Sequence, residues 1–128
     1  MESIQIHDKH FVPFIHKDKI NRYVEFMAYQ IAEDIGPDEV PIFIGILNGS
    51  FMFAAELFKR ISLIESEISF VKLASYDGDK TTGKVKQLIG LNENIEGRTV
   101  VILEDIVDTG ITIENIIGQL EKLNPNEI

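Results

Sequence analysis

Acidic and hydroxyl side chains gather around one predicted strand-to-helix transition in the sequence. Glu104 and Asp105 follow the apolar run Val100–Leu103, and Asp108 precedes the run Thr109-Gly110-Ile111-Thr112. Carboxylates can hold sugar hydroxyls or Mg²⁺, while free N–H groups at a helix N-terminus suit a phosphate. A glycine lets the backbone approach such a ligand closely, and threonine hydroxyls add donors. The pattern therefore predicts a phosphate-binding turn with an acidic pair beside it.

The two adjacent carboxylates set a condition on this prediction. Neighbouring residues of a β-strand point to opposite faces of the sheet. Glu104 and Asp105 can therefore meet the same ligand only if the strand has already ended before them.

Hydrophobic periodicity predicts the elements that must position this turn. Apolar residues at three- and four-residue spacing indicate helices, and short uninterrupted apolar runs indicate strands covered on both faces. The expected elements are helices over Asp18–Ile35 and Phe51–Ile61, strands over Pro41–Leu47, Glu67–Tyr76, Val85–Leu91 and Arg98–Leu103, and a last helix from Ile113 to Asn124-Pro125. Their alternation predicts an α/β fold with a mainly parallel sheet flanked by helices, plus one long-looped hairpin.

Polar residues interrupt this pattern in two connecting segments. Asn48-Gly49-Ser50 forms a turn in which Ser50 is expected to cap the second helix, and that helix is apolar enough to be well buried. The segment from Asp77 to Lys84 carries glycines and charges, so a mobile loop is expected there.

Composition narrows the class of protein. The 128 residues fit one domain, and a net charge of −9 argues against nucleic acid as the main partner. The absence of cysteine excludes disulfides and thiol catalysis. No apolar run reaches the roughly 18 residues of a membrane span, and the N-terminus lacks the features of a signal peptide, so a cytoplasmic protein without a membrane partner is expected. His7, His10 and His16 fit no standard metal motif and are expected at the surface.

The run from Val100 to Thr112 resembles the PRPP-binding signature of the type I phosphoribosyltransferases. That signature consists of an apolar strand, two acidic residues, two apolar residues and Asp-Thr-Gly-x-Thr, and all of it is present. A lone Asp-Thr-Gly also surrounds the catalytic aspartate of aspartic proteases. Those proteins are all-β, whereas this turn is predicted to open a helix.

Two further segments resemble the hypoxanthine-guanine branch of that family. One is the strand-to-helix turn Leu47–Ser50, whose Leu47–Asn48 peptide is often cis in relatives, many of which carry Lys or Arg in place of Asn48. The other is Ser75-Tyr76, which begins a mobile loop that closes over the site in the family.

The resemblance implies a purine-salvage reaction that uses Mg²⁺. PRPP and hypoxanthine or guanine would give the nucleoside monophosphate, IMP or GMP, and pyrophosphate. The resemblance implies that Glu104 and Asp105 bind the ribose and the metal, and that the 5′-phosphate is bound by Asp108, Thr109, Gly110, Ile111 and Thr112. It also implies that Asp108 acts as general base at purine N7. Asn48 and Gly49 would bind the pyrophosphate, and the closing loop would begin at Ser75 and Tyr76.

Other readings of the same residues stay open. Another type I phosphoribosyltransferase could act on xanthine, adenine or a pyrimidine. A non-catalytic relative could bind PRPP or nucleotides as a regulator, and a plain α/β fragment could have no activity.

The C-terminal end of the sequence departs from the expected pattern. The last helix leads to Asn126-Glu127-Ile128, where a βαβ unit requires another strand. In the family, the residues that contact the purine lie further along the chain. We therefore expect a truncated phosphoribosyltransferase domain over residues 1–128 with little transferase activity, or a chain that pairs with a second copy to complete its sheet. By resemblance, a homo-oligomer (dimer or tetramer) is expected.

Overall fold

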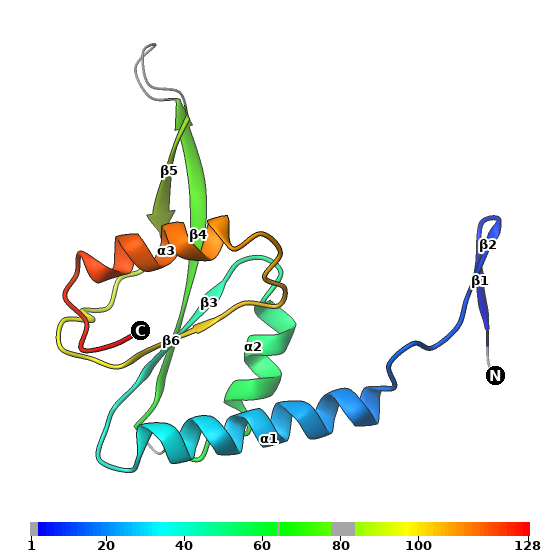
Figure 1. Cartoon of the computed structure of the whole chain (residues 1–128), viewed down its shortest axis with the longest axis horizontal. Coiled ribbons are helices and arrows are strands. Elements are labelled where there is room, and N and C mark those ends of the chain that lie inside the picture. Colours follow the sequence, from blue (N-terminus) through cyan, green and yellow to red (C-terminus); the bar gives the residue numbers. More distant parts are fainter. Residues whose placement is uncertain (1–2, 64, 78–83) are drawn as a thin grey trace.

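A four-stranded sheet forms the centre of the computed structural model, which describes residues 3–63, 65–77 and 84–128 (Figure 1). Its strands are β3 (Ile42–Ile46), β4 (Glu67–Asp77), β5 (Lys84–Ile89) and β6 (Val100–Leu103), in the order β5-β4-β3-β6. β3 runs parallel to β4 and to β6, whereas β5 runs antiparallel to β4. The predicted α/β class, with a mainly parallel sheet and one hairpin, is confirmed.

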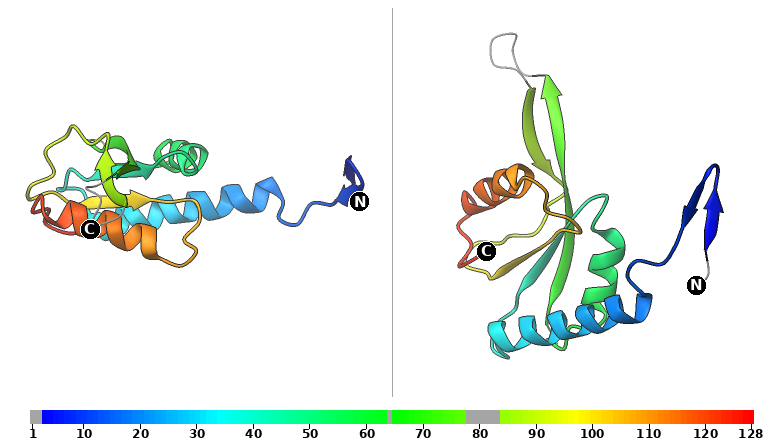
Figure 2. Two further views of the ribbon diagram at one scale, coloured as in Figure 1. Left: turned by 90° about the horizontal axis from the view of Figure 1, so that it is seen from above. Right: turned by 45° about the vertical axis from the view of Figure 1, so that its right-hand side comes forward.

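Helices cover both faces of this sheet. α1 (Lys17–Ile35) and α2 (Phe51–Phe58) pack on one face, and α3 (Ile111–Glu121) packs on the other. A short hairpin that the sequence did not predict, β1 (Ile4–Ile6) with β2 (Lys9–Phe11), stands apart from the sheet in both views of Figure 2.

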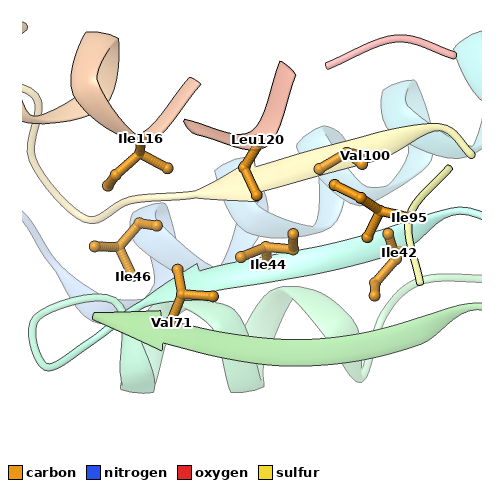
Figure 3. Close-up of a cluster of buried hydrophobic side chains, with 8 residues drawn as sticks. All are labelled: Ile42, Ile44, Ile46, Val71, Ile95, Val100, Ile116 and Leu120. Atoms are coloured by element: carbon orange, nitrogen blue, oxygen red, sulfur yellow. The ribbon is translucent and has the colours of Figure 1, made fainter. Parts of the chain in front are cut away.

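The central strand β3 is buried along its whole length because both of its faces are covered. Ile42, Ile44 and Ile46 alternate onto the side of α3, where Ile116 and Leu120 point toward the sheet (Figure 3). Phe43 points the other way, into a cluster with residues of α1 and α2. An uninterrupted apolar run is what a strand covered on two faces requires.

The second helix differs from its prediction in length and burial. It ends at Phe58 rather than Ile61, and Phe51 and Met52 are 55% and 67% exposed. The expectation of a well-buried helix was wrong because α2 covers the sheet with one stripe only, in which Ala54 and Leu57 are fully buried. An apolar composition does not reveal which sides of a helix find a partner.

Ser50 occupies the N-cap position of α2 without capping it by its side chain. Its buried hydroxyl instead donates to the carbonyl of Ile46 at 2.6 Å. The predicted side-chain cap was therefore wrong, and the hydroxyl ties the start of the helix back to the end of β3.

The apolar stripe of α1 is only partly covered. Val24 and Ala28 are buried against the sheet, whereas Ile20 and Met27 are 49% and 41% exposed. Figure 1 shows that the N-terminal half of α1, which contains Ile20, extends past α2 toward the separate hairpin.

The segment after α3 runs to the outer edge of β6. The Val100 amide donates to the Glu127 carbonyl at 3.0 Å, and the Asn126 amide donates to the Arg98 carbonyl at 2.9 Å. Thr99 and Glu127 form a parallel bridge. The helix thus returns the chain to the sheet in the direction that a βαβ unit requires. Among the described residues, no helix has the length and apolar character for crossing a membrane.

Truncating the centre of the sheet should cost far more than truncating the exposed part of α1. Ile44→Ala removes a side chain with no exposed surface, and we expect a loss of about 2–5 kcal/mol in the free energy of unfolding. Ile20→Ala, the same change at a half-exposed position, should stay within about 0.5 kcal/mol. Urea unfolding followed by circular dichroism measures both. Equal losses would contradict the assignment of the core.

Candidate active site

Two loops meet at one edge of the sheet because β3 and β6 are parallel neighbours. Gly45 of β3 lies opposite Leu103 of β6, so both strands end at the same level. The turn Leu47–Ser50 follows β3, and the segment Glu104–Gly110 follows β6. The carboxyl ends of parallel strands are where α/β sheets bind ligands.

The backbone of Gly49 lies directly against the carboxylate of Asp105. A Cβ atom built on Gly49 would lie 2.7 Å and 2.8 Å from the two carboxylate oxygens, so a side chain at this position would push Asp105 away. The contact joins the first loop to the second. The Leu47–Asn48 peptide is cis, as the resemblance implies, and Asn48 and Gly49 are exposed at this edge.

Glu104, the other member of the acidic pair, lies at a pocket. It lines a pocket of about 230 Å³ together with Ile106, Val107, Asp108, Thr109, Gly110, Thr112 and Ile113. β6 has already ended at Leu103, so the condition on the two carboxylates is met. They nevertheless face different surroundings: Glu104 borders the pocket, while Asp105 borders Gly49.

Burial raises the pKa of the Glu104 carboxyl, and the neighbouring Asp105 side chain raises it further. A hydrogen bond from the Asp105 amide, at 3.1 Å, opposes this effect without cancelling it. Desolvation and a second carboxyl group both disfavour the charged form of an acid. The Glu104 carboxyl therefore gives up its proton less readily than a fully solvated glutamate.

Gly110 allows the turn into α3. Its φ of +87° lies in the left-handed region, which a residue with a side chain adopts only with strain. The Glu114 amide donates to the Gly110 carbonyl at 2.9 Å, so intrahelical bonding begins there. The first amides of a helix have no partner within it, and here Thr112 and Ile113 of the first turn line the pocket. Asp108 and Thr109 are exposed beside them.

Apolar residues at the pocket were not assigned a role from the sequence. Ile106 and Val107 are 75% and 59% exposed, and both line the pocket with Ile113. The signal was available, because these two apolar residues stand between acidic ones in a segment that has no strand to bury them. They could contact an apolar surface of a ligand.

The third predicted segment lies farther along the sheet. Ser75 and Tyr76 are still in β4, opposite Lys86 and Val85 of β5, and Ser75 does not line the pocket described above. Residues 78–83 of the predicted loop lie outside the described residues.

The acidic pair has the chemistry to hold a divalent cation. The part of the chain that the structure describes holds no group of three or more His, Asp or Glu side chains placed to bind a metal. Mg²⁺ usually keeps several waters and binds one or two carboxylates together with substrate phosphates. Glu104 and Asp105 offer such a donor set. His7, His10 and His16 are exposed, as expected.

A family model described as the phosphoribosyl transferase domain matches residues 15–128. The chain belongs to this family. It is 33% identical over 113 residues to the hypoxanthine-guanine phosphoribosyltransferase of Dictyostelium discoideum, and 43% identical over 88 residues to the hypoxanthine phosphoribosyltransferase of Buchnera aphidicola. These matches cover 86% and 68% of the chain, but only 63% and 49% of the two relatives.

Solved structures of the family share the fold. A hypoxanthine-guanine phosphoribosyltransferase from Bacillus anthracis superposes with a TM-score of 0.75 at 28% identity, covering 91% of this chain and 66% of that one. A hypoxanthine phosphoribosyltransferase from Trypanosoma cruzi, solved as a ternary substrates complex, gives 0.71 at 28% identity, covering 86% and 64%. The predicted family and fold are confirmed.

The raised pKa of Glu104 makes a prediction about stability and pH. The folded state binds the Glu104 proton more tightly than the unfolded state, so stability is lost as the pH rises from the ordinary pKa of 4.5 through the higher folded pKa. We expect Glu104→Gln to raise the free energy of unfolding at pH 7 in Mg²⁺-free buffer. That gain should shrink as the pH falls toward 4.5.

Urea unfolding between pH 4 and 7 tests this, with Glu121→Gln as a charge-matched control at an exposed position of α3. A Glu104→Gln gain that grows on acidification would have the wrong sign for a partly buried carboxyl whose pKa is raised.

Proposed function

We propose that this chain carries the PRPP-binding part of a hypoxanthine-guanine phosphoribosyltransferase. The reaction would transfer the 5-phosphoribosyl group from PRPP to hypoxanthine or guanine, giving IMP or GMP and pyrophosphate. The observation that supports it best is the meeting of the Gly49 turn with Asp105 beside the pocket of residues 104–113. This edge can hold a diphosphate at one loop and a monophosphate at the other.

The 5′-phosphate would bind at the turn into α3. Thr109, Gly110, Ile111 and Thr112 offer backbone amides there, and the positive end of the helix dipole favours an anion. The Ile111 amide donates to the Thr109 hydroxyl at 3.4 Å, a long bond that a phosphate oxygen could replace. Asp108 borders the same pocket.

The ribose hydroxyls and Mg²⁺ would bind Glu104 and Asp105. The metal would neutralise the pyrophosphate and make it a better leaving group. Asn48 and Gly49 would line the pyrophosphate site, where the missing side chain of Gly49 lets the Asp105 carboxylate lie directly against the backbone. Asn48 supplies an amide where many relatives have a cation, so this chain would depend more on the metal for charge neutralisation.

Asp108 is the proposed general base at purine N7. It is exposed and lies at the pocket between the acidic pair and the phosphate turn. Base assistance of this kind contributes roughly 10²–10⁴-fold to a rate.

The proposed partners of the chain are small molecules (PRPP, a 6-oxopurine, a nucleoside monophosphate and pyrophosphate) and a second copy of the chain. Neither nucleic acid nor a membrane is a proposed partner, and the proposed location is the cytoplasm.

Binding of Mg²⁺–PRPP to this chain tests the site. We expect isothermal titration calorimetry to give a saturable signal that Gly49→Ala weakens at least about tenfold, because the new Cβ displaces Asp105. Gly118→Ala is a matched control, since a Cβ on Gly118 meets nothing within 4 Å. Equal affinities of the wild type and Gly49→Ala would contradict the role of this contact.

Asp108→Asn separates catalysis from binding. The substitution keeps the size and polarity of the side chain, so we expect Mg²⁺–PRPP affinity to stay within about threefold. In a longer form of the protein that turns over, nucleotide formation should fall roughly 10²–10⁴-fold. A coupled spectrophotometric assay measures the turnover. Parallel losses of affinity and turnover would count against a general base.

A further inference from the structure

The outer edge of β5 is bound by a side chain of α3. β5 is the end strand of the sheet order β5-β4-β3-β6. The carbonyl of Lys86 and the amide of Leu88 lie two residues apart, so both point to the same edge of the strand. Both groups are taken by Gln119.

Gln119 binds the strand with both ends of its amide group. The Leu88 amide donates to Gln119 Oε1 at 2.9 Å, and Gln119 Nε2 donates to the Lys86 carbonyl at 3.2 Å. Asn115, one turn earlier on α3, accepts a second bond from Nε2 at 2.6 Å and fixes the orientation of the amide. One donor and one acceptor on a single edge are what a neighbouring strand would offer.

Buried apolar residues near Gln119 support these hydrogen bonds. Ile116 and Leu120, which flank Gln119 on α3, have no exposed surface, and Leu73 and Leu88 of the hairpin pack against their cluster. Figure 1 shows α3 crossing the base of β5. The first turn of α3, where we place the 5′-phosphate, begins eight residues before Gln119, which corresponds to about 12 Å along the helix.

Building on the proposed function, we infer that Gln119 is a positioning residue that couples the opening of α3 to the opening of β5. Occupation of the phosphate turn at one end of α3 then stabilises the strand tied to the helix farther along. The coupling has two states. In one the side-chain amide of Gln119 binds β5, and in the other it binds water. A ligand that favours the packed position of α3 favours the bound state.

Hydrogen exchange measured by NMR on the 128-residue chain tests the hydrogen bonds between Gln119 and β5 without any ligand. In the wild type, the Leu88 amide should exchange through the same opening as the Ile116 amide, with the same dependence on denaturant. Gln119→Leu should speed exchange at Leu88 at least about tenfold and leave Ile116 within about twofold.

Two variants keep this test independent of a general loss of stability. Gln119→Glu retains an acceptor for the Leu88 amide, so it should preserve most of the protection at Leu88. Gln30→Leu makes the same change as Gln119→Leu at an exposed position of α1 and should alter neither amide. Unchanged Leu88 exchange in Gln119→Leu, or equal acceleration at Leu88 and Ile116, would overturn the inference.

The ligand arm tests the coupling. Saturating Mg²⁺–PRPP should slow Leu88 exchange in the wild type, whereas Gln119→Leu should bind the ligand and show no slowing at Leu88. Equal slowing in both proteins would overturn the coupling. A wild type that binds no Mg²⁺–PRPP would instead contradict the proposed function. The ligand-free exchange experiment would then be the test of the hydrogen bonds between Gln119 and β5.

Discussion

The parallel pairing of β3 with β6 is the constraint on which the rest of the site depends. It brings the ends of two strands that are far apart in the sequence to one edge of the sheet. The Gly49 turn and the acidic pair then meet because each is the first segment beyond its strand. Burial of β3 on both faces holds this pairing, since its isoleucines pack against α3 and its phenylalanine against α1 and α2. The core of the fold and the geometry of the site therefore have the same cause.

The electrostatics of the edge explain how an acidic protein could bind a highly anionic ligand. The chain carries a net charge of −9, and its pocket is bordered by Glu104 and Asp108. In the proposed site, attraction for phosphate would come from backbone amides, from the dipole of α3 and from a metal ion. The raised pKa of Glu104 has the same origin as its fitness for a cation: a partly buried carboxylate beside another acid gains most from a neighbouring positive charge.

The sequence predicted the elements whose pattern depends on local periodicity. β3, β6 and α3 were expected within a few residues, since a strand covered twice is uniformly apolar and the phosphate turn has a recognisable composition. The burial of α2 was overestimated, because periodicity does not show how many neighbours a helix has. The hairpin β1–β2 was missed, since strands of three residues carry no measurable alternation. The sequence named candidate residues in both loops, which stay predictions, but it did not reveal the contact between the loops. That a side chain at Gly49 would displace the Asp105 carboxylate follows only from the fold, because no local pattern connects the two residues. The hydrogen bonds between Gln119 and β5 also join residues far apart in the sequence, so no local pattern predicts them.

The central claim is that the 5′-phosphate of PRPP binds at the first turn of α3 while its pyrophosphate binds at the Gly49 turn. The most direct measurement compares the ¹H–¹⁵N spectra of the chain titrated with Mg²⁺–PRPP and with Mg²⁺–pyrophosphate. We expect PRPP to shift the amides of residues 109–113 and of residues 48–50, and pyrophosphate to shift only the second group. PRPP binding that leaves the amides of residues 109–113 unmoved would contradict it.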